Sequence, residues 1–358
     1  MRCRYGIRAF DTSVYYGPSE IVLGNILHAL QGEFPRSSYK LVRTRFSLNG
    51  ERLNDDSYHR QMTKCGRYGV STFDYSPTTI RESVKRSLER LKTDYLDTVY
   101  LHDVEFVATP VAPRRTGNHT VALGAEAAAY GLDLGNETKI WGEGDQKVLD
   151  GFHELQKLKE EGLVKNIGIT GESGAPSFGI LASLWLLGFP LPTLLRLSIL
   201  ILHTAPYKPV DVLLSYSHLC LQNSAFLEFI PHFYERAKIG QLLAASPLSM
   251  ALLTSNPPSW HPAPLELRKA VVESANTWEG DYPNLAVGYS VRQTSFAKEP
   301  LPLVVGFSTP KEVHESVKVW REVQAGSEND SRQMGEETAR EVFRQAGFLD
   351  WSWASPGP

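Results

Sequence analysis

Short apolar segments alternate with longer amphipathic segments along most of this chain. Residues 76–91 and 146–162 have helical periodicity, with Ser76 and Pro77 opening the first segment and Gly162 closing the second. Seven short segments, rich in apolar and β-branched residues, are predicted to be strands: 6–13, the residues just before 63, 97–103, 164–171, 210–218, 239–248 and 302–309. Such alternation predicts a parallel sheet with crossover helices.

Two observations choose between the parallel folds. No GxGxxG motif follows a predicted strand, so the doubly wound dinucleotide fold lacks its signature. Polar residues instead recur where strands end, the place where α/β barrels keep their active sites. Because seven strands are counted, we expect a (β/α)8 TIM barrel whose first strand and helix are missing from this chain.

Composition excludes several classes of function. A net charge of −3 on 358 residues produces no positive electrostatic field that would attract nucleic acid or an anionic membrane. Cys3, Cys65 and Cys220 are too few and too scattered for a disulfide framework or a metal site. We therefore expect no metal and a cytoplasmic protein. The oligomeric state is left open.

One uncharged apolar run, residues 178–195, reaches the length of roughly 18 residues at which a membrane span becomes a candidate. Pro190 and Pro192 would interrupt a spanning helix, and Arg196 follows it. We therefore expect no membrane association.

The predicted strand ends carry chemistry. Asp11 and Tyr16 follow the first strand, Lys64 follows the second, and His102 with Asp103 ends the third. Taken singly, such a tyrosine or histidine is usually a packed residue and such a lysine is usually solvated. Together on one rim, these residues predict acid–base chemistry at a carbonyl.

The motifs FDTSVYYGPSEIVLG, TKCGRYG, YLHDVEF, KEEGLVKNIGITG, SPLSMALLT and GFSTPKEVHESV occur in the order seen in the aldo-keto reductases. The chain resembles that family from about residue 5 to residue 323, and within it the branch of fungal D-arabinose dehydrogenases and plant L-galactose dehydrogenases. The resemblance implies the same barrel, with NAD(P) bound at the C-terminal rim.

The resemblance also implies catalytic roles. Tyr16 would transfer the proton, Lys64 would stabilise its anion, Asp11 would hold Lys64, and His102 would orient the substrate oxygen. A free phenol, with a pKa of about 10, needs such help near neutrality. The implied reaction oxidises a small aldose, such as D-arabinose, at C1 to the aldonolactone. Two alternatives stay open: a general aldehyde or ketone reductase, and an inactive barrel that is either a regulatory or binding protein or the product of a defective gene model.

The family also implies residues that contact the cofactor. Glu312 stands where NADP-preferring relatives often place an arginine, so we expect NAD to be preferred, with NADP possible because Lys311 lies beside it. Ser308 and Thr309 open a helix whose N-terminus suits phosphate. The implied cofactor-binding residues are Thr170, Gly171, Ser246, Leu248, Gly306, Ser308, Thr309 and Glu312.

Domain organisation follows from these boundaries. We expect a barrel over residues 1–325 and a C-terminal tail over residues 326–358. Segments 42–61 and 172–188 interrupt the family pattern, and removing each restores it. We interpret both as translated introns and the short N-terminus as a missed exon. Genuine surface loops are the alternative.

Overall fold

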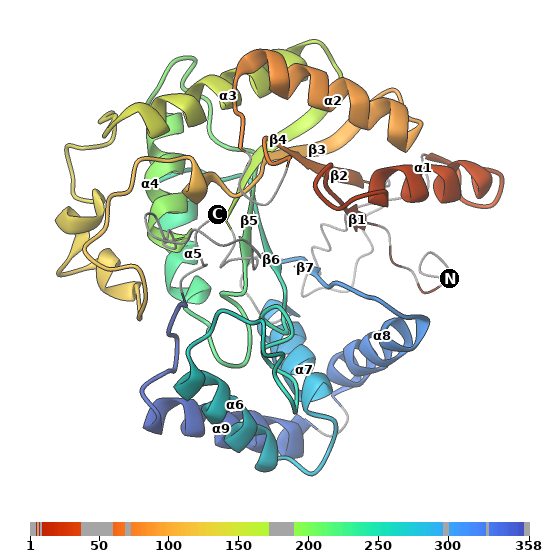
Figure 1. Ribbon diagram of the computed structural model, residues 1–358, viewed down its shortest axis with the longest axis vertical. Coiled ribbons are helices and arrows are strands. Elements are labelled where there is room, and N and C mark those ends of the chain that lie inside the picture. Colours follow the sequence, from red (N-terminus) through yellow and green to blue (C-terminus); the bar gives the residue numbers. More distant parts are fainter. Residues whose placement is uncertain are drawn as a thin grey trace, which may run out of the picture.

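Seven parallel strands form a nearly closed barrel with helices outside them in the computed structural model (Figure 1). The structure describes residues 5, 7, 9–36, 60–68, 73–171, 190–295, 301–326 and 329–353. Neighbouring strands pair in chain order, from β1 to β7. The strands are β1 Ala9–Asp11, β2 Arg60–Cys65, β3 Leu96–Leu101, β4 Val164–Gly171, β5 Val212–Tyr216, β6 Gln241–Ala245 and β7 Leu303–Val304. The predicted strands and fold class are confirmed.

Helices connect successive strands and cover the outside of the sheet (Figure 1). They are α1 Ser19–Ala29, α2 Pro77–Leu91, α3 Glu143–Glu160, α4 Pro190–Leu202, α5 Phe226–Glu235, α6 Leu265–Asn276, α7 Tyr282–Ser295, α8 Pro310–Ala325 and α9 Asn329–Gln345. The predicted Pro77 start of α2 is confirmed, whereas α3 begins three residues before the expected Gln146. Three short 3₁₀ helices lie between β3 and α3: Val104–Phe106, Thr120–Leu123 and Ala127–Tyr130.

Alternating strand residues divide the core into two layers. Met62, Tyr100 and Leu214 belong to a small cluster inside the barrel, whereas Val99 and Leu213 belong to the large cluster between the sheet and its helices. This two-sided burial explains why β3 is buried along its whole length. Because all seven strands are parallel, their carboxyl ends share one rim, which gathers the polar residues that follow them.

The described end of the apolar run, residues 190–195, lies in α4 and packs into the protein core. Pro190 begins α4 and Pro192 lies in its first turn, where proline is tolerated, so neither interrupts the helix. Leu194 and Leu197 are fully buried in the cluster beneath the sheet. Within the described ranges, no helix is long and apolar enough to cross a membrane.

The expected insertion 42–61 overlaps the start of a strand. Arg60 and Gln61, the last residues of the segment expected to be an insertion, belong to β2 and pair with Ala9 and Phe10. Residues 42–59 and the whole of 172–188 lie outside the described residues. Within the expected tail, α9 packs against α6 and α7, and its Phe343 is fully buried.

Candidate active site

Lys64 lies at the centre of the predicted catalytic group. Its Nζ donates to the hydroxyl of Tyr16 at 3.2 Å and to the carbonyl oxygen of Thr12 at 3.4 Å. It also forms an ion pair with the carboxylate of Asp11. The parallel pairing of β1 with β2 produces this arrangement, because Asp11 is in register with Met62, two residues before the lysine. The structure therefore brings together three residues that are up to 53 positions apart.

Burial differs sharply within this group. Lys64 is 3% exposed, whereas Tyr16 is 40% exposed at the mouth of the barrel. Burial raises the pKa of the Asp11 carboxyl, and the Lys64 ammonium works in the opposite direction. A buried cation thus lies beside an accessible phenol, and a cation so placed would stabilise the phenolate form of the tyrosine.

His102 completes the group from the end of β3. Its ring lies edge-on to the Tyr16 ring, with centroids 5.8 Å apart. The Nδ1 atom lies 3.2 Å from the Ser13 hydroxyl. Burial lowers the pKa of His102 to about 3, although the neighbouring Asp103 carboxylate opposes the shift, so the imidazole is neutral near pH 7.

The residues expected to hold a cofactor end β4 or follow β6 and β7, on the same rim. Ser246 has a left-handed backbone, with φ of 60°, and its amide donates to Val304 at 3.1 Å. Leu248 is partly buried against the helices beyond β6. Gly306 has open space where a side chain would project, since none of the described atoms lies within 4 Å of that position.

Thr170 and Gly171 end β4 and contact the loop that follows β3. The Thr170 hydroxyl accepts from the Asp103 amide at 3.1 Å and lies 3.4 Å from the Asp103 carboxylate, so it fixes the loop after β3. A Cβ at Gly171 would lie 3.0 Å from Leu194 and 3.2 Å from the Glu105 carboxylate. A residue larger than glycine would therefore have to displace Leu194 or Glu105.

The N-terminus of α8 is capped by its own glutamate. Glu312 accepts from the Ser308 amide at 2.7 Å, and its amide donates to the Thr309 hydroxyl at 3.3 Å. This resembles a capping box, except that the glutamate accepts from the amide of Ser308, one residue before the N-cap Thr309. At the helix end where the sequence predicts a phosphate contact, the Glu312 carboxylate accepts from the Ser308 amide and adds a negative charge.

Comparison with known proteins assigns the family. Residues 2–331 match the Aldo/keto reductase family. The chain belongs to this family. D-arabinose 1-dehydrogenase of Saccharomyces cerevisiae is 30% identical over 361 residues, covering 99% of this chain and 85% of that protein. L-galactose dehydrogenase of Arabidopsis thaliana is 34% identical over 345 residues, covering 95% and 80% respectively. The chain is therefore an NAD(P)-dependent oxidoreductase of the aldo-keto reductase family.

Solved structures of other aldo-keto reductases support the fold. One from Bacillus halodurans has a TM-score of 0.54 and 17% identity, covering 94% of this chain and 84% of that one. A glycerol dehydrogenase from Gluconobacter oxydans has a TM-score of 0.53 and 16% identity, covering 97% and 84%. At this identity the likeness concerns the barrel alone.

The rim of this aldo-keto reductase fits a nicotinamide cofactor in two respects. The open space at Gly306 lets a ligand approach the backbone closely, and Ser246 turns the chain at the end of β6. Thr170 and Gly171 border the loop that carries His102 and Asp103. When bound, the cofactor would supply the hydride acceptor or donor.

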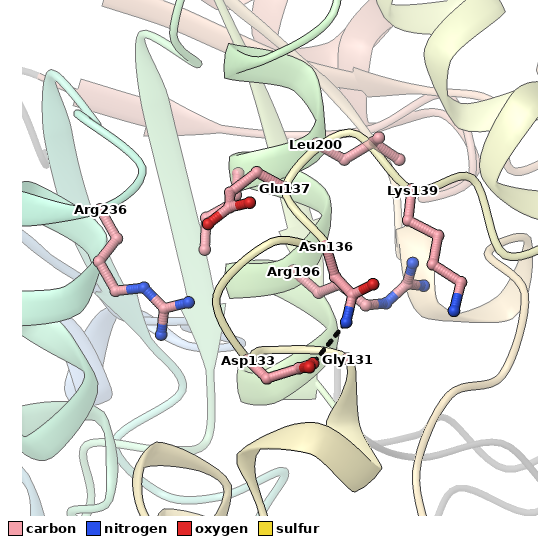
Figure 2. Close-up of a pocket in the computed structure, with 9 residues that line it drawn as sticks. Gly131, Asp133, Asn136, Glu137, Lys139, Arg196, Leu200 and Arg236 are labelled. Atoms are coloured by element: carbon pink, nitrogen blue, oxygen red, sulfur yellow. Dashed lines mark hydrogen bonds between the residues drawn. The ribbon is translucent and has the colours of Figure 1, made fainter.

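A small pocket elsewhere contains none of these residues. Figure 2 shows it between the loop from Gly131 to Lys139 and α4, with Arg236 approaching from the end of α5. Asn136 donates to Asp133 at 2.6 Å there, and Arg236 donates to the carbonyl of Leu132 at 2.5 Å. Both cationic and anionic side chains line this pocket, and its hydrogen bonds hold the loop together and against the end of α5.

The sequence analysis gave no individual role to Arg67 or Asp103, two buried charged residues beside His102. Arg67 and Asp103 are each 2% exposed and form an ion pair. Arg67 lies in the motif TKCGRYG with Lys64, and Asp103 lies in the motif YLHDVEF with His102. The presence of a charged residue just after an apolar strand could have marked each of them. It could not have predicted that the loop after β2 and the loop after β3 would be joined by an ion pair.

Proposed function

We propose that this aldo-keto reductase oxidises a small aldose of the D-arabinose type at C1 to the aldonolactone, using NAD in preference to NADP. The observation that carries the proposal is the Lys64–Tyr16 contact of 3.2 Å, with Asp11 paired to the same ammonium. The names of the two curated relatives suggest the substrate class. The catalytic roles of Asp11, Tyr16, Lys64 and His102 are part of this proposal.

In the proposed reaction the protein handles the proton. Tyr16, as the phenolate stabilised by Lys64, takes the proton of the anomeric hydroxyl and later releases it to solvent. A bound nicotinamide cofactor would accept the hydride, with its electron pair, from C1, so that the two electrons lost by the sugar are gained by the cofactor. His102, neutral and buried, donates a hydrogen bond that orients the C1 oxygen.

The preference for NAD is proposed from Glu312. A carboxylate that already caps α8 would repel a 2′-phosphate and would have to leave the Ser308 amide to admit it. A ribose hydroxyl could instead donate to the same carboxylate. Lys311 beside it is a cation that would weaken the discrimination.

The test is turnover measured with matched substrates. Purified full-length chain is supplied with NAD or NADP and with D-arabinose, L-galactose or glycerol, and absorbance of the reduced cofactor is followed. The proposal expects NAD reduction with an aldose and a lactone product. Faster NADPH-dependent reduction of a simple aldehyde would favour the general reductase. Cofactor binding without any turnover would favour the inactive barrel.

A further inference from the structure

His102 borders a buried ion pair that the reaction does not otherwise use. Arg67 follows β2 and Asp103 follows β3, and their side chains pair beneath the rim. The same carboxylate oxygen of Asp103 lies 3.4 Å from Nε2 of His102. Each of the three side chains is 2% exposed, so these charges act on the imidazole with little screening by solvent.

Arg67 is held by aromatic rings as well as by Asp103. Its guanidinium carbon lies 4.3 Å from the centroid of the Tyr15 ring, 5.4 Å from that of Phe73 and 5.7 Å from that of Phe106. Phe73 and Phe106 stack on each other. A planar guanidinium among ring faces has little freedom to move. Arg67 therefore fixes the position of the carboxylate it binds.

The backbone of Asp103 also points to a constrained position. Its φ of 58° lies in the left-handed region, which a residue other than glycine, asparagine or aspartate rarely adopts. The Thr170 hydroxyl accepts from the Asp103 amide at 3.1 Å and holds this turn. The turn directs the carboxylate back toward the ring of the preceding residue.

The two ring nitrogens of His102 face different chemical groups. On one side the Ser13 oxygen accepts from the Tyr15 amide at 3.1 Å, and its hydroxyl proton can be donated to Nδ1 at 3.2 Å. On the other side a carboxylate oxygen faces Nε2. A carboxylate only accepts, so an N–H toward it is favourable and a lone pair toward it is repulsive.

We propose that Asp103, held by Arg67, is a positioning residue that keeps the single proton of neutral His102 on Nε2. That proton is the one His102 would donate to the substrate oxygen, so the inference rests on the proposed function for its catalytic consequence. The contact of 3.4 Å is longer than a good hydrogen bond, so it biases the tautomer and leaves the N–H available to substrate.

Two substitutions of Asp103 separate its effect on the His102 tautomer from its ion pair with Arg67. Asp103→Gly and Asp103→Asn both tolerate the left-handed backbone and both remove the charge opposite Arg67. Only Asp103→Asn keeps an oxygen that can accept from Nε2. Nitrogen-15 correlation spectra of histidine-labelled protein without substrate report which ring nitrogen carries the proton, and the His102 signals are identified by their loss in His102→Asn.

We expect the spectra to show the His102 proton on Nε2 in the parent and in Asp103→Asn. In Asp103→Gly we expect the proton on Nδ1, or a mixture of the two tautomers. With an active substrate, kcat of Asp103→Gly should fall by about 10–100-fold, and Asp103→Asn should recover most of it. If Asp103→Gly does not fold, Arg67→Met/Asp103→Gly removes the unpaired cation and is measured instead. An Nδ1–H parent, or an Nε2–H glycine variant, overturns the inference. The spectra need no substrate, so failure of the proposed reaction would be seen separately.

Discussion

The Nζ atom of Lys64 lies 3.2 Å from the hydroxyl oxygen of Tyr16, which stands 48 residues earlier in the chain. The lysine is buried and the tyrosine is accessible. A cation fixed beneath an accessible phenol favours the phenolate, and this relationship determines the first two predictions.

Tyr16→Phe should lower kcat for aldose oxidation by about 10²–10⁴-fold, because it removes the proposed proton-transfer group. Affinity for the cofactor should stay near the parent value, as measured by fluorescence titration. Tyr95→Phe is the matched control, since Tyr95 immediately precedes β3 at the opposite end of the barrel. Turnover of Tyr16→Phe within a few-fold of the parent would contradict the assigned role.

Lys64→Met should abolish most activity and also destabilise the fold by about 3–5 kcal/mol, because Asp11 loses its buried counterion. Lys64→Met/Asp11→Asn should regain much of that stability without regaining kcat. Chemical denaturation and steady-state kinetics on both variants separate the two effects. A double variant with restored kcat would show that the lysine is structural only.

Substitution of Glu312 should change the choice of cofactor. Glu312→Gln keeps a side chain able to accept from the Ser308 amide while removing its charge. It should narrow the affinity gap between NAD and NADP by about fivefold, the equivalent of about 1 kcal/mol. Glu312→Arg should narrow it further or reverse it. Equal affinities for both cofactors in the parent would remove the basis of this prediction.

Acid should destabilise the protein through its buried histidines. Burial lowers the pKa of His218 to about 3, below its ordinary value of 6.5, so the folded state keeps it neutral while the unfolded chain binds a proton. This contribution is fully present above pH 6.5 and is lost as pH falls toward 3. His102 behaves in the same way.

The corresponding variant is His218→Asn, which preserves a polar atom near the Ser215 hydroxyl that Nδ1 contacts at 3.2 Å. Between pH 4 and pH 5.5 its free energy of unfolding should fall less steeply than that of the parent, by about 1.4 kcal/mol per pH unit. Urea titrations at several pH values measure the slope. An unchanged slope would mean that His218 is protonated in the folded state.

Local sequence patterns were sufficient to predict the barrel and the polar residues at its strand ends. Strand and helix periodicity depends on neighbours within a few positions, and the strands around Lys64 and His102 were recognised from it. Parallel strands necessarily share one rim, so Asp11, Tyr16, Lys64 and His102 could be expected to meet. The sequence motifs alone were also sufficient to predict the family.

Only the tertiary structure decided how the charges pair. Arg67 and Asp103 are 36 residues apart, and Thr170 is a further 67 from Asp103, so no local pattern links them. The sequence predicted that the N-terminus of α8 suits phosphate, and only the fold shows that Glu312 accepts from the Ser308 amide there. Short-range periodicity fixes which segments become strands, but hydrogen bonds between distant loops depend on strand register and left-handed turns, which exist only once the barrel has assembled.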